Sequence, residues 1–385
     1  MTGKVYNMAE RMADSGAGHI EDSGFGPQVL VIADDLTGTL DSAVAFAGPG
    51  RRVCVARRVE AVPQALATGA AVIAVNTASR EIPEAEALAR LQGLFAMLDL
   101  GAVPLVFKKV DSRLKGHVAA ESRAVAQAAG AARILALPAI PDMGRVQQGG
   151  QITGTGVDRP IDIADRFGGG ARDGIEVPEA GSDAEIDACV AGAPGGTLWA
   201  GARGLAFALA RARFGAAGQG AVPFLPAPAI FALGSRDPIT VVQAEELADH
   251  APRICAPDGL LQPGGAGAPL TLVQLTDGGA GRPAREAGAD FAHGVAALVR
   301  ESGTRFLLAS GGETADAILD RLGIDVVDVM AELAPGLPVC SAPASWGSFL
   351  IATKSGGFGA PDLLCRLAGW VGQEESGAPA EPRKT

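Results

Sequence analysis

Short apolar runs alternate along this chain with segments of helical periodicity. The first run, residues 29–33, is rich in β-branched residues and has no polar alternation, which is typical of a strand buried on both faces. Further strands are predicted at residues 52–56, 71–75, 103–107, 133–137, 197–200, 229–233, 270–275, 305–309 and 349–353. Helices are predicted from Pro83 and over residues 119–129, 202–213, 239–249, 283–300, 314–322 and 361–371. This alternation predicts an α/β protein built on mainly parallel sheets.

A Gly- and Pro-rich stretch divides the pattern into two series. Residues 215–228 carry little charge and are predicted to be a linker, so that residues 28–214 and 229–372 form two domains, each a mainly parallel sheet flanked by helices. Residues 147–183 have weak periodicity and are expected to form a surface excursion or a small hairpin. Residues 1–27 and 373–385 are expected to be disordered tails.

Composition narrows the classes of function. The net charge of -11 argues against nucleic acid as the main partner, because phosphate backbones are held by clustered lysine and arginine. The five cysteines include no C-x-x-C pair, so neither a zinc ribbon nor a disulfide framework is indicated. No apolar run approaches the roughly 18 residues of a membrane span, and a cytoplasmic protein is expected.

Charged residues gather at predicted strand ends in the first domain. Asp34 and Asp35 follow the first strand, where ligands bind in open α/β sheets, although Asp34 could equally cap a helix. The exit of the strand at 103–107 carries a cluster of cations around Asp111, composed of Lys108, Lys109, Arg113 and Lys115. Such a cluster binds carboxylate or phosphate, and the neighbouring acids and Ser112 suit hydroxyls. This mixture of cations, acids and a hydroxyl indicates a polyhydroxy acid as the ligand. The alternative is that the cluster is a basic turn exposed to solvent.

The second domain has three glycine turns between a strand and a helix, GSRDP at 234–238, SGGET at 310–314 and KSGGFG at 354–359. Glycines at such turns let backbone N–H groups approach phosphate oxygens, and nearby hydroxyls add donors. None of the three is a Walker or dinucleotide fingerprint. Together they favour a nucleotide site.

An acid-binding half joined to a phosphate-binding half points to phosphoryl transfer, in which the protein positions reactants and neutralises charge. A carboxylate near the acceptor hydroxyl would orient it or accept its proton. Asp111 and Asp35 are the candidates, with Asp111 ahead because cations flank it.

Taken together, the motifs resemble those of the four-carbon acid sugar kinase family, whose members phosphorylate threonate, erythronate or 3-oxo-tetronates with ATP. The resemblance runs in order from residue 29 to residue 371, through DDLTG, NTASR, KKVDSRLKG, PAIPDMGR, GSRDP, SGGETADAILDRLGI and KSGGFGAPDLL. It implies an active site in a cleft between the domains, ATP and Mg2+ as cofactors with unassigned metal ligands, phosphorylation of a terminal hydroxyl, and a possible homodimer.

The site residues then divide between two ligands. The residues expected to contact the sugar acid are Asp34, Asp35, Arg80, Lys108, Lys109, Asp111, Ser112 and Arg113. The residues expected to contact the nucleotide are Ser235, Ser310, Gly311, Gly312, Thr314, Lys354, Gly356, Gly357, Phe358 and Gly359.

Two other functions remain open. The sequence DLTGTL at 35–40 resembles the aspartyl-phosphate loop of haloacid dehalogenase-type phosphatases, in which Asp35 would be a nucleophile and Lys354 the accompanying lysine. A non-catalytic sensor of acid sugars is the second alternative. Its support is that the SRLKG and GSRDP turns depart from the family's usual sequences.

Overall fold

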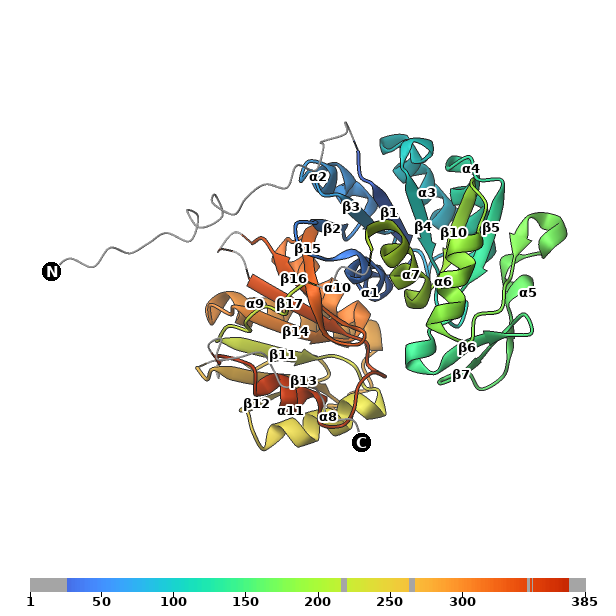
Figure 1. The fold of residues 1–385 in the computed structure, drawn as a ribbon. Coiled ribbons are helices and arrows are strands. Elements are labelled where there is room, and N and C mark those ends of the chain that lie inside the picture. The colour runs from blue at the N-terminus through green and yellow to red at the C-terminus, as the bar shows by residue number, and fades with distance from the viewer. Residues whose placement is uncertain (1–25, 216–219, 263–266, 345–346, 348, 374–385) are drawn as a thin grey trace.

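The computed structural model describes residues 26–215, 220–262, 267–344, 347 and 349–373. Its main feature is a single 14-stranded sheet in the order β12-β13-β11-β14-β17-β16-β15-β2-β3-β1-β4-β10-β5-β9. Helices flank this sheet, and the first half of the chain (blue to green) lies beside the second half (yellow to red) (Figure 1). The predicted α/β class is confirmed.

The first half contributes seven parallel strands. These are β1 (Val29–Ala33), β2 (Val53–Ala56), β3 (Val72–Asn76), β4 (Leu105–Lys109), β5 (Arg133–Leu137), β9 (Ile175–Glu176) and β10 (Thr197–Gly201). The helices of this half are α1 (Leu36–Ala43), α2 (Val62–Leu66), α3 (Glu84–Met97), α4 (Val118–Ala128), α5 (Ile163–Phe167), α6 (Asp183–Gly192) and α7 (Arg203–Phe214). β1 to β3 are buried along their whole length, as apolar runs without alternation require.

The second half repeats this winding. Its parallel strands are β11 (Ala229–Leu233), β12 (Arg253–Pro257), β13 (Leu270–Thr276), β14 (Phe306–Ser310) and β17 (Phe349–Lys354). Its helices are α8 (Pro238–Ala248), α9 (Ala284–Glu301), α10 (Gly312–Leu322) and α11 (Leu363–Ala368). The order β12-β13-β11-β14-β17 matches the order β2-β3-β1-β4-β10 of the first half.

An antiparallel hairpin joins the two halves into one sheet. β15 (Val326–Ala334) and β16 (Leu337–Ala342) pair with each other, β16 pairs with β17, and β15 pairs with β2 of the first half. The sequence predicted two sheets and assigned no strand to residues 323–348. One hydrophobic core cluster accordingly contains side chains of both halves, including α1 and α10.

The remaining segments lie at the margins. β6 (Arg145–Gln148), β7 (Gln151–Gly154) and β8 (Ile161–Asp162) form a small separate antiparallel sheet where a surface excursion or hairpin was expected. Four residues of the predicted linker, 216–219, lie outside the described residues, as do residues 1–25 and 374–385 of the predicted tails. Within the linker, Leu225 is buried and forms a bridge with Val371. The domain boundaries stay a prediction.

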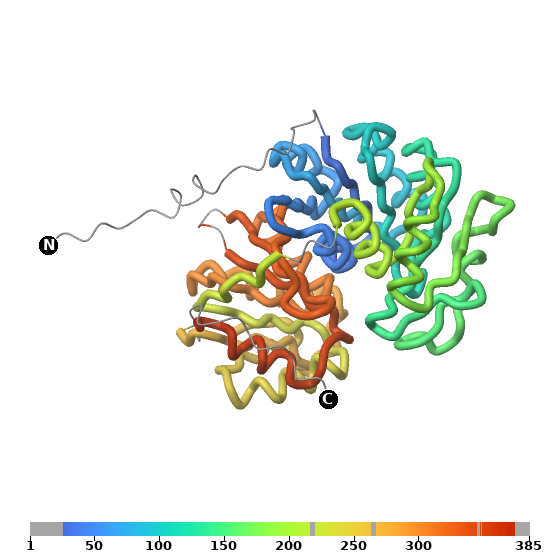
Figure 2. The backbone as a smooth tube through the Cα atoms, viewed as in Figure 1, coloured from blue at the N-terminus to red at the C-terminus, as the bar shows by residue number. Residues whose placement is uncertain are grey.

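The winding determines where a ligand can bind. In each half the strand order reverses beside the first strand, so that β1 lies between β3 and β4, and β11 lies between β13 and β14. Ligands of open α/β sheets bind at the carboxyl end of strands at such a reversal. Asp34 follows β1 and Gly234 follows β11, and the course of the backbone through both halves can be followed in Figure 2.

Candidate active site

A carboxylate–arginine cluster lies at the carboxyl end of β1. The Arg80 side chain donates to both oxygens of Asp34, through Nε at 3.0 Å and Nη2 at 2.7 Å, and Nη2 also lies 2.6 Å from Asp35 Oδ1. Asp35 is the N-cap of α1 and accepts a hydrogen bond from the Gly38 amide. Asp34 therefore binds Arg80 rather than capping the helix.

The backbone holds this cluster in place. The amides of Ser79 and Arg80 both donate to the Asp34 carbonyl. Below them, the Ser79 hydroxyl donates to Glu121 of α4, whose other carboxylate oxygen lies 2.7 Å from Lys108 Nζ. Because this pair is fully buried and hydrogen-bonded, it fixes the end of β4 against the loop that carries Arg80.

The end of β4 supplies the next group of side chains. Asp111 Oδ2 lies 3.6 Å from Arg80 Nη1, and Asp111 Oδ1 accepts hydrogen bonds from the Arg113 and Lys115 amides. Ser112 accepts a hydrogen bond from Arg145. These contacts place the carboxylate of Asp111 next to the arginine that also holds Asp34 and Asp35.

Lys109 is the exception among these charges. It is buried, yet its Nζ makes no hydrogen bond or ion pair with any of the residues that the structure describes. It lines the same cavity as Asp35 and Asp111, and its positive charge acts on both carboxylates. A buried ammonium without a carboxylate partner is costly, which indicates a place for an anionic ligand group.

The pKa values of the three aspartates are shifted in different directions. Burial alone would raise the pKa of Asp34, but the hydrogen bond from Arg80 and the charges of Lys108, Arg80 and Lys109 hold it below its ordinary value. Burial would also raise the pKa of Asp111, but Lys109, Arg80 and two backbone amides together lower it. In Asp35 burial prevails, with help from the charges of Asp34 and Asp111, and the pKa is raised.

Three loops meet at the carboxyl ends of β11, β14 and β17. The Gly234 and Ser235 amides donate to the Ser310 carbonyl, and the Gly311 amide donates to the Lys354 carbonyl. A Cβ at Gly356 would lie 2.1 Å from Ser235 Oγ, so only glycine allows this approach. The glycine turns predicted from the sequence are therefore adjacent in space.

The α10 helix begins at this junction. Its N-cap is Gly311 at φ 105°, a conformation that favours glycine, and no side chain caps the helix. Within the described part of the chain, the amides of Gly312 and Glu313 have no hydrogen-bond acceptor, so they can bind an anion.

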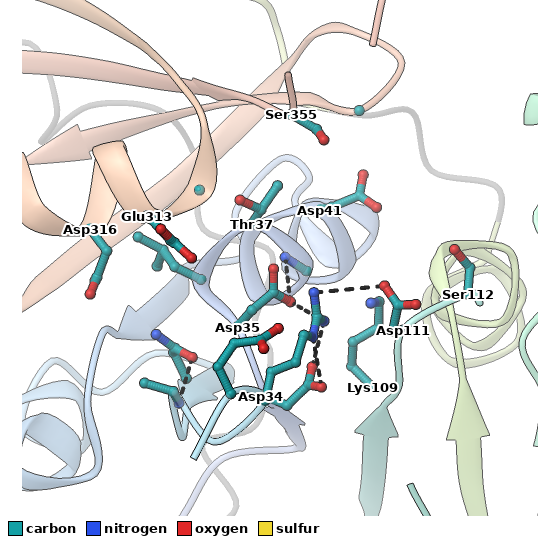
Figure 3. Close-up of a pocket in the computed structure, with 18 of the residues that line it drawn as sticks. Asp34, Asp35, Thr37, Asp41, Lys109, Asp111, Ser112, Glu313, Asp316 and Ser355 are labelled. Carbon is teal, nitrogen blue, oxygen red and sulfur yellow. Dashed lines mark hydrogen bonds and ion pairs between the residues drawn. The ribbon is translucent and has the colours of Figure 1, made fainter. Parts of the chain in front are cut away.

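A cavity of about 460 Å³ has walls from both halves. Asp35, Lys109, Asp111 and Ser112 lie on one side, and Glu313, Asp316 and Ser355 lie on the other (Figure 3). The two walls meet at Thr37 and Gly312, where a Cβ on the glycine would lie 2.4 Å from the threonine Oγ1.

The predicted sugar-acid residues largely converge on this cavity. Its lining includes Asp34, Asp35, Arg80, Lys109, Asp111 and Ser112. Lys108 does not line it, because neighbouring strand residues point to opposite faces of the sheet and its ammonium is paired with Glu121. Arg113 is exposed and contributes its backbone amide, not its side chain, to Asp111.

Fewer of the predicted nucleotide residues reach the lining. Gly312 and Phe358 line the cavity. Those that are not part of the lining are Ser235, Ser310, Gly311, Thr314, Lys354, Gly356, Gly357 and Gly359. Among them, the Lys354 and Ser310 side chains are fully buried.

Sequence reasoning missed part of the lining. The additional residues are Leu36, Thr37, Gly38, Asp41, Asn76, Ala78, Glu81, Ile140, Glu313, Asp316 and Gly336. Asp41 lies one helical turn beyond Thr37, a spacing visible in the sequence. Asp316 also pairs with buried Arg57.

A buried arginine, Arg203, supports two parts of this lining. It pairs with Asp41 of α1 at 2.8 Å and with Glu332 of β15 at 2.6 Å, and Glu332 in turn accepts the Gly336 amide. Burial raises the pKa of Asp41 despite the arginine. Arg203 is the first residue of α7, a position where the helix dipole disfavours a cation. A cation at this unfavourable position is the sequence signal that could have identified Arg203 as a candidate.

The cavity also suits a magnesium ion bound through a ligand. Among the described residues no group of three or more His, Cys, Asp or Glu is arranged to hold a metal. Carboxylates outnumber cations in the lining, so a polyanionic ligand needs added positive charge. Mg2+ commonly binds one or two carboxylates together with phosphate oxygens and water, and the donors present fit that mode.

Two domain families match the chain. A "Sugar-binding N-terminal domain" matches residues 29–162, and a "Nucleotide-binding C-terminal domain" matches residues 270–364. None of the helices in the described ranges is long and apolar enough to cross a bilayer.

Known proteins resemble the chain along most of its length. A D-threonate kinase of Cupriavidus necator is 30% identical over 91% of this chain and 99% of its own length. A D-threonate kinase of Bordetella bronchiseptica is 28% identical over 89% of this chain and 97% of its own. A 3-oxo-tetronate kinase of Methylobacterium radiotolerans is 33% identical, but over 32% of this chain and 29% of its own.

Solved structures share the fold. A Salmonella typhimurium protein described as a putative tRNA synthase superposes with a TM-score of 0.70 at 19% identity, over 88% of this chain and 98% of its own. A Haemophilus influenzae protein of the DUF1537 family superposes with a TM-score of 0.65 at 19% identity, over 88% of this chain and 99% of its own. From the full-length match to a curated relative and the two domain matches, the chain belongs to the four-carbon acid sugar kinase family.

Proposed function

We propose that this protein is an ATP- and magnesium-dependent kinase that phosphorylates a terminal hydroxyl of a four-carbon sugar acid, with D-threonate as the first substrate to test. The observation that carries the proposal is the buried ammonium of Lys109, which has no partner among the described residues and lines a cavity whose opposite wall contains uncapped helix amides. The ammonium suits the carboxylate of a sugar acid, and the amides suit phosphate. D-threonate is favoured because both relatives described above that align along most of the chain are D-threonate kinases.

The residues of the first half would bind and activate the acceptor. Lys109 would hold the substrate carboxylate, while Arg80 keeps Asp34 and Asp35 oriented. Asp35 is the better candidate base, because a raised pKa strengthens its affinity for a proton, whereas the lowered pKa of Asp111 makes it a weaker base. Asp111 would then orient hydroxyls as an acceptor. This assignment reverses the order that the sequence suggested.

The residues of the second half would hold the nucleotide. Free amides at the start of α10 and in the loop after β17 would bind the phosphates. Glu313, in the first turn of α10, would hold Mg2+ together with phosphate oxygens. The metal supplies charge neutralisation as the phosphoryl group transfers.

The phosphatase alternative finds less support in the geometry. In that chemistry a lysine must accompany the nucleophilic aspartate. Lys354, the candidate, is fully buried, and its ammonium binds the carbonyls of Ser355 and Gly356.

A coupled ADP-release assay across the threonate and erythronate stereoisomers and their 3-oxo derivatives tests the proposal. We expect ADP formation that requires Mg2+ and is fastest with D-threonate. Phosphate release from phosphoesters without ATP would establish the phosphatase instead. Sugar-acid binding in calorimetry without any nucleotide binding would establish the sensor. A homodimer and a cytoplasmic location stay predictions.

A further inference from the structure

Lys354, the last residue of β17, is buried in an unusual environment. Its side chain is 1% exposed, and its ammonium donates to Ser355 O at 3.0 Å, Gly356 O at 3.2 Å and Thr240 Oγ1 at 3.2 Å. All three partners are neutral. Among the described residues no carboxylate lies within ion-pair distance of this ammonium, and Asp237 acts on it only from farther away.

Lys108 offers an internal comparison. It is also 1% exposed and also lies near the end of a parallel strand, but its ammonium lies 2.7 Å from the Glu121 carboxylate. A buried charge is normally compensated in this way. Lys354 lacks such compensation, so its charge costs stability, and a role other than stability is the natural reason for it to be there.

The carbonyls that face Lys354 determine where the neighbouring amides point. In a trans peptide the C=O and N–H groups point in opposite directions. When the Ser355 and Gly356 carbonyls turn inward to the ammonium, the Gly356 and Gly357 N–H groups turn outward. Neither N–H has an acceptor among the residues that the structure describes.

The same loop borders the cavity. Ser355 and Phe358 line it, Gly357 is exposed, and Ser355 can be seen facing the space between the two halves (Figure 3). From α8, Thr240 donates to Gly356 O, and Gln243 donates to the carbonyls of Phe358 and Ala360. Inward carbonyls therefore recur along residues 355–360.

We infer that Lys354 is a positioning residue that never touches the nucleotide: its ammonium turns the Ser355 and Gly356 carbonyls inward, so that the Gly356 and Gly357 amides are presented to a nucleotide phosphate. The inference rests on the proposed function, and it replaces the direct contact with nucleotide that the sequence suggested for this lysine. An aligned pair of backbone amides is a known form of anion-binding site.

The test compares Lys354→Met with Lys108→Met, since methionine has nearly the volume of lysine without its charge. MgADP and D-threonate affinities are measured by isothermal titration calorimetry, and the midpoint of thermal unfolding by circular dichroism. For Lys354→Met we expect MgADP affinity to fall about tenfold, because two donors lose their orientation. D-threonate affinity should stay as in the wild type, with an equal or higher unfolding midpoint. Lys108→Met should lower the midpoint, because Glu121 is left unpaired.

Thr240→Val provides a second variant that keeps the lysine. It removes one acceptor of the ammonium and one donor to Gly356 O, so a smaller loss of MgADP affinity is expected. Wild-type MgADP affinity in Lys354→Met would overturn the inference. So would a lowered midpoint with equal losses for both ligands, which marks a merely structural lysine. Wild-type protein that binds no MgADP would instead overturn the proposed function, and this inference with it.

Discussion

Arg203 and Glu332 form a two-pronged buried ion pair that joins α7 of the first half to β15 of the second. Arg203 Nη1 lies 2.6 Å from Glu332 Oε1, and Nη2 lies 2.9 Å from Oε2. The same guanidinium reaches Asp41 in the cavity wall and Asp142 nearby. One side chain thus connects both walls of the candidate active site.

Removal of this arginine should be severely destabilising. Arg203→Met leaves Glu332 and Asp41 without their cation, and we expect a loss of about 3–5 kcal/mol in the free energy of unfolding, measured with urea. Glu332→Gln should cost less, because Arg203 keeps Asp41 and Asp142. Equal losses for the two variants would show that Glu332 is the only partner that matters.

Lys109→Met should weaken the sugar acid selectively. The loss of a buried charge and the loss of its attraction for Asp35 and Asp111 oppose each other, so thermal stability should change little. The KM for D-threonate should rise about 10- to 100-fold, the value of one charge-assisted contact. Steady-state kinetics with each substrate varied in turn measures this. If only the KM for ATP rises, Lys109 does not bind the sugar acid.

Asp35 should govern the acid limb of the pH–rate profile. A base must be ionised to accept a proton, and its raised pKa means that kcat/KM rises as pH increases through that value. Asp35→Asn should lower kcat by about 10²- to 10⁴-fold and remove the limb. Asp111→Asn is the matched comparison. If it abolishes turnover and Asp35→Asn does not, the two roles are reversed.

The substitution Gly312→Val should prevent the two walls of the cavity from approaching each other. Its Cβ would meet Thr37 Oγ1 at 2.4 Å, so closure over both substrates would be blocked and kcat/KM for both should fall. Gly288→Ala on α9 is the control, because a Cβ there meets no other atom and alanine favours the helix by about 0.5–1 kcal/mol. Unchanged kinetics in Gly312→Val would show that this contact plays no part in catalysis.

The stability of Lys354→Met relative to the wild type should depend on pH. Burial lowers the pKa of Lys354 to about 8 from 10.5, so between these values the unfolded chain binds more protons than the folded one, and wild-type stability gains as pH rises. The cost at neutral pH is on the order of 3 kcal/mol. The advantage of the variant should therefore be largest below pH 8 and shrink towards pH 10 in urea unfolding. A difference in unfolding free energy between variant and wild type that does not change with pH would contradict this prediction.

The local pattern of apolar and polar residues predicted much of the secondary structure. The apolar runs correspond to β1, β3, β5, β11 and β17 within a residue or two, because strands buried on both faces need continuous hydrophobicity. Charges placed directly after those runs converged as expected, because parallel strands end at one edge.

Long-range pairing was harder to predict. The β15–β16 hairpin closes the gap between the halves, but its sequence does not say which strand it will meet, and the pairing with β2 depends on residues more than 200 positions apart. Arg203 and Glu332 were missed for the same reason. The faces of Lys108 and Lys109 follow from the two-residue period of a strand, which the sequence contained but the prediction did not use.

The main-chain pairing of β2 with β15 has a consequence for dissecting the protein. If the halves were produced as separate polypeptides, each would present an unpaired strand edge, and such edges attract other chains. The fragments should therefore be aggregation-prone alone and recombine when refolded together. The proposed sugar-binding and nucleotide-binding halves are thus joined by main-chain hydrogen bonds, and we expect neither to keep its function as an isolated fragment.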